Sequence, residues 1–276
     1  AYYIQKRQFV LAAKEYTRAL NIVPTSIKDM VALGFCYAED DDYMKAEAAF
    51  VTAMALQQLT PGLNPDDPGR VDVMRSLACL LFDEGRYGEA ATQFENLVVG
   101  FKNKGATADD AFLLAKSKLL RDLTDNSARS MLAVYEVLSP GKKEAFRYGM
   151  IEALIDAGMA QMARHELDKM PTESRADNAL YGLYDSACLR LEGKIDEALA
   201  AIKKVEPLAD SVKADNPSLA SRIYVEEARI ELAKGDTDKA AKAADHAVST
   251  YDKSYPAYLA QAEIASKKGE IKQATE

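Results

Sequence analysis

The chain has 276 residues, of which 48% are hydrophobic and 28% are charged, and its formal net charge is −8. This composition is typical of a globular protein, and it excludes a disordered chain because apolar residues are plentiful. It also excludes a collagen-like repeat, since only 14 Gly and 9 Pro are present. No uninterrupted apolar run reaches about 18 residues, so membrane insertion is not expected.

The charged and reactive residues narrow the classes of function. The negative charge is spread along the chain without a basic stripe, which disfavours a nucleic-acid partner. Three distant cysteines, Cys36, Cys79 and Cys188, form no CxxC pair, so neither a metal site nor a cofactor is expected. Unpaired cysteines favour a reducing compartment such as the cytoplasm. The periplasm stays open, because the chain starts within a helical pattern and a leader could have been removed.

A pattern of small and apolar residues recurs along the chain, and each copy is centred on one alanine. In chain order, the clearest copies read FVLAAKEYTRALNIVP (9–24), YMKAEAAFVTAMAL (43–56), GRYGEAATQFENLV (85–98), GMAQMARHELDKM (158–170), GKIDEALAAIKKV (193–205) and GDTDKAAKAADHAV (235–248). A weaker copy, NSARSMLAVYEVL, covers 126–138. The central residues are Ala12, Ala46, Ala90, Ala128, Ala163, Ala198, Ala240 and Ala274. Four of the seven spacings lie within one residue of 34, and the longer spacings predict inserted loops.

This pattern resembles the tetratricopeptide repeat (TPR), a helix–turn–helix unit of 34 residues. The second copy matches it best, and the residues that carry the match are Met30, Leu33, Gly34, Tyr37, Tyr43, Ala46, Phe50 and Ala53. The family usually has Trp where Met30 stands, and this chain has no Trp. The resemblance implies an all-α fold, a right-handed α-solenoid of tandem helix–turn–helix repeats that forms one superhelical domain over 1–276. The expected repeats are 1–24, 27–60, 71–102, 107–140, 143–172, 177–210, 219–252 and 255–276, the first and last being incomplete.

Helix-breaking residues agree with this division of the chain. Five glycines are expected at the turn within a helix pair, where a left-handed residue ends the first helix. They are Gly85, Gly158, Gly193, Gly235 and Gly269. All nine prolines, Pro207 among them, are expected in connections or at helix starts, because proline is costly inside a helix. Lys116 occupies a position that the family gives to a small residue.

An inserted segment and the two ends of the sequence depart from the regular repeat pattern. The segment 58–72, with three prolines, is expected to form a loop that projects from the solenoid; a partner-binding loop and a tolerated surface insertion both explain it. Both ends of the sequence cut through a repeat, so we expect a fragment of a longer repeat protein.

The resemblance also indicates where a partner binds, because the first helix of each TPR lines the concave face. The aligned groove residues are Val31, Phe35, Glu39, Arg75, Cys79, Phe82, Leu113, Ser117, Tyr148, Glu152, Ile155, Arg190 and Arg229. Family members that hold the acidic tails of heat-shock chaperones use a clamp of Lys and Asn on their first helices. At the positions that correspond to the clamp, this chain has Val31, Phe35, Arg75, Cys79, Leu113 and Ser117. That clamp is absent here, and the mixed lining favours an apolar or amphipathic segment.

We therefore expect a non-enzymatic scaffold that binds a protein or peptide in its groove. A bacterial assembly, secretion or export complex is the setting that analogy favours. Two alternatives remain open: a peptide-sensing regulatory module attached to an output domain, and a scaffold that forms homo-oligomers through its terminal repeats. An enzyme that uses His165 or His246 would need one of them beside Cys79 or Cys188.

Overall fold

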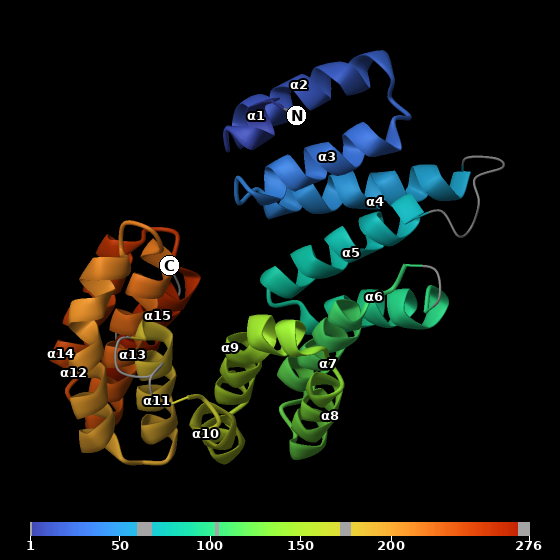
Figure 1. Cartoon of the computed structure of the whole chain (residues 1–276). Helices are drawn as coiled ribbons and strands as arrows, with labels where there is room; N and C mark the ends of the chain where they lie inside the picture. Colours follow the sequence, from blue (N-terminus) through green and yellow to red (C-terminus); the bar gives the residue numbers. More distant parts are fainter. Residues whose placement is uncertain (1, 60–67, 103–104, 172–177, 270–276) are drawn as a thin grey trace. The chain divides into compact units, whose positions relative to one another are not determined.

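The computed structural model describes residues 2–59, 68–102, 105–171 and 178–269, and this part of the chain consists of α-helices without a strand (Figure 1). The helices are α1 (Tyr2–Gln5), α2 (Phe9–Ile22), α3 (Ile27–Ala38), α4 (Tyr43–Leu59), α5 (Pro68–Asp83), α6 (Tyr87–Gly100), α7 (Ala108–Asp122), α8 (Asp125–Glu136), α9 (Pro140–Asp156), α10 (Ala160–Asp168), α11 (Ala179–Leu191), α12 (Ile195–Val212), α13 (Pro217–Lys234), α14 (Thr237–Thr250) and α15 (Tyr255–Lys268). None of these described helices combines the length and apolar character that crossing a lipid bilayer demands.

Helices pack in pairs within the predicted repeats, as α3 with α4 and α5 with α6 show in Figure 1, and the described part of the last predicted repeat holds α15 alone. The prediction of an all-α fold of tandem helix–turn–helix repeats is therefore confirmed, and the bounds of the individual repeats stay a prediction. The predicted loop over 58–72 is too long, because α4 continues to Leu59 and α5 already begins at Pro68. Proline at the first position of a helix costs no hydrogen bond, so Pro68 starts α5 instead of preventing it. The rest of this segment, 60–67, lies outside the described residues.

The chain divides into two compact units, residues 1–144 and 145–276. The first unit contains a core of fully buried side chains from its helix pairs, among them Phe94, Phe112, Leu119 and Met131. The second unit has its own buried set, which includes Ile151, Leu167, Ile202 and Ile230. Within each unit, helices thus bury their apolar faces against one another, as stacked repeats require. The expectation of one continuous superhelical domain stays a prediction.

Close helix approach within a repeat depends on small residues. A Cβ atom added to Gly34 of α3 would lie 2.7 Å from the Phe50 ring of α4, closer than real Cβ contacts come. Ala46 and Ala90, the central alanines of the second and third copies, are fully buried. Only small side chains at these points let a large ring such as that of Phe50 fill the space between the paired helices.

The expected turn glycines all have a left-handed backbone. Gly85, Gly158, Gly193, Gly235 and Gly269 have φ values of 75°, 75°, 77°, 91° and 79°. At Gly235 the backbone N–H donates to the carbonyls of Glu231 and Leu232 and so closes the end of α13. An L-residue with a side chain rarely adopts this conformation, which explains why glycine recurs at the turn.

Proline placement differs from the prediction at one site. Pro207 lies inside α12, which continues to Val212, although the sequence predicted a connection there. Its ring leaves the carbonyl of Lys203 without an N–H donor from position 207. The helix is extended by this segment all the same, and Ala209, beyond the proline, is buried. Burial of the apolar face after Pro207 offsets the lost hydrogen bond.

Replacing Gly34 by Ala tests the close approach of α3 and α4. The new methyl group must displace the Phe50 ring, so we expect the Gly34→Ala variant to lose about 1–3 kcal/mol of unfolding free energy. Gly100→Ala is the matched control, because Gly100 is helical and has open space around it. It is expected to change stability by no more than about 0.5 kcal/mol. Urea denaturation followed by circular dichroism measures both, and equal stabilities for the two variants would contradict the packing account.

Candidate functional site

A cavity of about 490 Å³ opens in the first unit between α3, the start of α4, and α5. Four of the groove residues expected from the sequence line it together: Phe35, Glu39, Arg75 and Cys79. Its wall also includes Ala38, Asp41, Tyr43, Phe50, Ser76, Leu80 and Asp83. We call this cavity the α3–α5 groove. Its volume is in the range of sites that bind small molecules or peptide side chains.

Phe35 is the apolar anchor of the α3–α5 groove. Its side chain is 42% exposed, which is unusual for a phenylalanine on a helix that packs on both neighbours. The ring meets Phe9 of α2 edge to face, with the ring centroids 6.0 Å apart. This contact holds one edge of the ring while the rest stays accessible to a partner.

Arg75 lines the groove, but its guanidinium group is already engaged. Nε and Nη2 donate to the two carboxylate oxygens of Asp110 at 2.7 and 2.9 Å, and Nη2 also donates to the carbonyl of Gly105 at 2.9 Å. Asp110 is fully buried and closes a capping box with Thr107 at the start of α7. Arg75 therefore joins α5 to α7, and orienting a partner is not its main task.

Two acidic residues of the groove have no such partner. Within the described residues, the carboxylates of Glu39 and Asp83 take part in no hydrogen bond or ion pair. Lys116 of α7 attracts Asp83 electrostatically. Asp83 is the last residue of α5, and Glu39 caps the end of α3. A negative charge at a helix C-terminus is unfavourable, because the macrodipole there is also negative.

The remaining groove residues of the first unit are less accessible. Ser117 is fully buried and donates to the carbonyl of Leu113 at 2.7 Å, so it offers no surface to a partner. Val31 and Leu113 are half-buried and pack against the core cluster around Phe50 and Phe94. These positions close the core between repeats instead of lining the groove.

Phe82 sits in a contact that its sequence position did not predict. It is half-buried, its ring meets Tyr87 edge to face at 5.3 Å, and the Lys116 Nζ atom lies 4.9 Å from the ring centroid. The lysine that replaces a small residue of the family pattern is thus placed over an aromatic face, where a cation is attracted.

In the second unit, predicted groove residues form a polar network. Glu152 pairs with Arg222 at 2.7 Å, and Arg222 also donates to the Tyr184 hydroxyl at 3.2 Å. Burial raises the pKa of Tyr184, since the ionised phenol is poorly solvated there. The hydroxyl of Tyr148 accepts a hydrogen bond from the Asn178 side chain at 2.7 Å. Tyr148 and Glu152 are therefore held in place by side chains of the next two predicted repeats.

The other predicted groove residues of the second unit differ among themselves. Arg190 forms a charge-assisted pair with Glu226 at 2.6 Å, and Ile155 is buried. Arg229 has no ion pair within the described residues, and it lines two cavities, one of about 570 Å³ with Arg190 and Lys267 and one of about 120 Å³ with Glu152 and Arg222. Arg229 is thus the predicted groove cation that is left available to a partner.

The histidines and cysteines give no support to a nucleophilic site in the described part of the chain. His246 stacks on Tyr224 with a centroid separation of 3.9 Å, and His165 is exposed on α10. Burial raises the pKa of Cys79 to about 11 and that of Cys188 to about 12, which disfavours the reactive thiolate. No group of three potential ligands that could hold a metal ion occurs among the described residues.

Sequence reasoning missed Asp83 and Asp110 as determinants of the groove. The alignment to the family identifies groove positions on the first helices. It does not show which charged residues at the ends of these helices lack a partner, so it does not single out Asp83. Asp110 lies 35 residues after Arg75, close to one repeat length, and this spacing is the signal that could have paired them. Arg190 and Glu226, 36 residues apart, follow the same rule.

Comparison with known proteins agrees with this architecture. A crystal structure of a tetratricopeptide repeat protein from Parabacteroides merdae is similar, with a TM-score of 0.51 and 14% identity over 90% of this chain and 89% of that one. The C-terminal part of a TPR repeat-containing protein from Cytophaga hutchinsonii has a TM-score of 0.47 and 12% identity over 94% and 96% of the two chains. No family model and no curated protein matches the sequence. The chain has the TPR fold, an α-helical repeat architecture.

Removing the Asp110 charge tests the structural role of Arg75. Burial tends to raise the pKa of Asp110, but hydrogen bonds from Arg75 and Thr107 outweigh burial and lower it. Asp110→Asn is expected to cost about 2–3 kcal/mol at neutral pH, because the charged hydrogen bonds of Arg75 are lost.

The lowered pKa of Asp110 also predicts how the cost of Asp110→Asn changes with pH. A carboxyl group whose pKa is lowered by folding stabilises the fold fully above its unfolded pKa of about 4, and this contribution is lost as the pH falls through the folded value. The stability difference between the parent and Asp110→Asn should therefore shrink below about pH 4. Urea titrations at several pH values measure it, and a pH-independent difference would show that the ion pair is not its cause.

Proposed function

We propose that the chain is a protein-interaction scaffold that binds a peptide or helical segment of a partner along the first helices of its repeats. The observation that carries this proposal is the α3–α5 groove, where an exposed Phe35 stands beside two unpaired carboxylates. Aromatic side chains that are accessible and rigidly held supply much of the binding energy in protein interfaces.

The chemistry of the groove favours a particular kind of segment. Glu39 and Asp83 form no hydrogen bond or ion pair within the described residues, whereas the cation Arg75 is neutralised by Asp110. A partner segment that places a Lys or Arg side chain near these carboxylates, next to an apolar side chain on Phe35, would complement both features. Binding would also relieve the unfavourable placement of negative charge at two helix ends.

A local rule that is broken without a compensating contact is a signal of function. Glu39 and Asp83 stand at helix C-termini, where Lys or Arg would stabilise the fold. Three of the predicted groove charges, Arg75, Glu152 and Arg190, instead have internal partners. The unpaired acids of the first unit therefore support the binding proposal more strongly than the paired groove charges do.

The biological setting is a separate proposal. The bacterial source of the first structural neighbour agrees with a bacterial assembly, secretion or export complex. A regulatory module and a homo-oligomeric scaffold remain the alternatives. Both alternatives would still use the groove or the terminal repeats for protein contact.

Peptide selection tests the groove directly. Short peptides selected from a random displayed library on the immobilised full chain should be enriched in Lys or Arg beside an apolar residue. Their dissociation constants, measured by fluorescence anisotropy, should rise about tenfold or more (~1.4 kcal/mol) in Phe35→Ala and in the double variant Glu39→Gln, Asp83→Asn. Melting temperature should not fall in the double variant, because both changes remove a negative charge from a helix end.

Matched controls separate binding from general effects of charge and surface. Glu15→Gln removes an exposed carboxylate on α2, and Val99→Ala removes an exposed apolar side chain at the end of α6. Both should bind the selected peptides like the parent. Peptides without basic enrichment that bind all four variants equally would refute the proposed site.

A further inference from the structure

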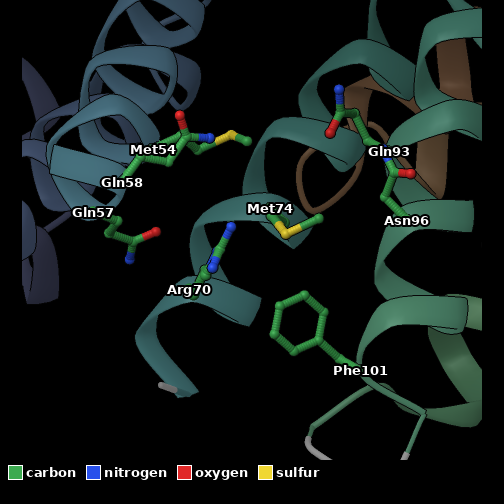
Figure 2. A pocket seen from close by; sticks show the side chains of 8 residues that line it. All are labelled: Met54, Gln57, Gln58, Arg70, Met74, Gln93, Asn96 and Phe101. Atoms are coloured by element: carbon green, nitrogen blue, oxygen red, sulfur yellow. The ribbon is translucent and has the colours of Figure 1, made fainter. Parts of the chain in front are cut away.

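A second cavity of the first unit lies between α4, α5 and α6 and has a volume of about 380 Å³ (Figure 2). Its lining residues are Met54, Gln57, Gln58, Arg70, Met74, Gln93, Asn96 and Phe101. None of these residues belongs to the α3–α5 groove or to the groove positions that the family alignment gives. The two cavities are lined by different residues of α4 and α5, and along α5 Met74 lines one cavity and Arg75 the other.

The floor of this cavity is apolar apart from one amide. Met74 and Phe101 are each 8% exposed, and Figure 2 shows the Phe101 ring beside the Met74 side chain. Gln57 is 7% exposed, and its Oε1 atom has no hydrogen-bond partner among the described residues. An amide oxygen buried in this way costs about 1–3 kcal/mol unless a donor reaches it. The cavity thus holds a buried acceptor that lacks its donor.

Arg70 supplies the cavity's charge. It is half-buried at the start of α5, no carboxylate lines the cavity, and Arg70 forms no ion pair or hydrogen bond within the described residues. This differs from Arg75, one turn further along α5, which holds Asp110. An unpaired guanidinium group at the wall of a cavity favours a planar anion, above all a carboxylate, which it can bind with two parallel hydrogen bonds.

Three requirements therefore define the ligand. It must carry a carboxylate for Arg70, an N–H or O–H donor for Gln57 Oε1, and an apolar group for Met54, Met74 and Phe101. A fatty acid lacks the donor, and a phosphate monoester carries more charge than one guanidinium group balances and offers mainly acceptors. Amino acids and their N-acyl derivatives with an apolar side chain meet all three requirements.

We propose that this cavity binds a small carboxylate of the amino-acid class through Arg70 and Gln57. The exposed amides Gln58 and Asn96 lie at its rim, where they can donate to and accept from the rest of the ligand. This site is independent of the partner segment proposed for the α3–α5 groove. The volume of about 380 Å³ falls within the range of small-molecule sites.

Methionine methyl NMR on the full chain tests this proposal. N-acetyl-L-leucine is titrated, and its uncharged amide and 4-methylpentanoate, which lacks the N–H donor, serve as matched probes. The Met54 and Met74 methyl signals should shift saturably with the acid, and both matched probes should bind about tenfold more weakly (~1.4 kcal/mol). The signals of Met131 and Met150, which are buried elsewhere, should stay unchanged.

Two variants and a control complete the test. Arg70→Met and Gln57→Leu should each weaken binding of the acid about tenfold or more. Because Gln57→Leu also removes the unpaired amide, it is expected to keep or raise the melting temperature. Arg129→Met changes an exposed arginine on α8 and should bind like the parent. The proposal is overturned if the acid causes no saturable shift at about 10 mM, if the amide binds as well as the acid, or if the folded Gln57→Leu variant binds like the parent.

Discussion

The close approach of the two helices within each repeat is the constraint on which the rest of this structure depends. At Gly34 no side chain larger than hydrogen fits beside the Phe50 ring, and at Gly182 a Cβ atom would lie 2.3 Å from Val205. Because one face of each helix is committed to this contact, the other face must meet the next repeat or solvent. The residues left between these two contacts form the grooves, so core packing decides which side chains a partner can reach.

Charges that alignment places in the concave face mostly connect successive repeats. Arg75 with Asp110 and Arg190 with Glu226 are pairs between first helices, separated by about one repeat length. Each pair includes a buried carboxylate, so losing either partner would leave a charge poorly solvated. Fewer groove cations are therefore free to contact a partner than the sequence implied. In the first unit, the charged groups left for recognition are carboxylates at helix ends.

The sequence predicts this fold well because its signals are local and repeat. The central alanines indicate close packing and the turn glycines such as Gly235 indicate left-handed backbone; among the described residues both are observed, and Ala274 lies outside that part of the chain. The sequence predicts Pro68 and Pro207 in loops, but a helix start tolerates proline and burial beyond Pro207 outweighs a lost hydrogen bond.

The sequence predicts which helices line the groove, but it does not predict which of their side chains are accessible. Exposure of Phe35, burial of Ser117 and the unpaired Gln57 depend on contacts between residues that alignment cannot place.

The central claim is that an exposed aromatic ring and two unpaired carboxylates make the α3–α5 groove a binding site for a basic, partly apolar segment. A crystal structure of the full chain with one of its selected peptides tests this claim most directly. The account predicts that the peptide lies against Phe35, with a Lys or Arg side chain within hydrogen-bond distance of Glu39 or Asp83. A peptide bound elsewhere on the molecule, with the α3–α5 groove empty, would contradict it.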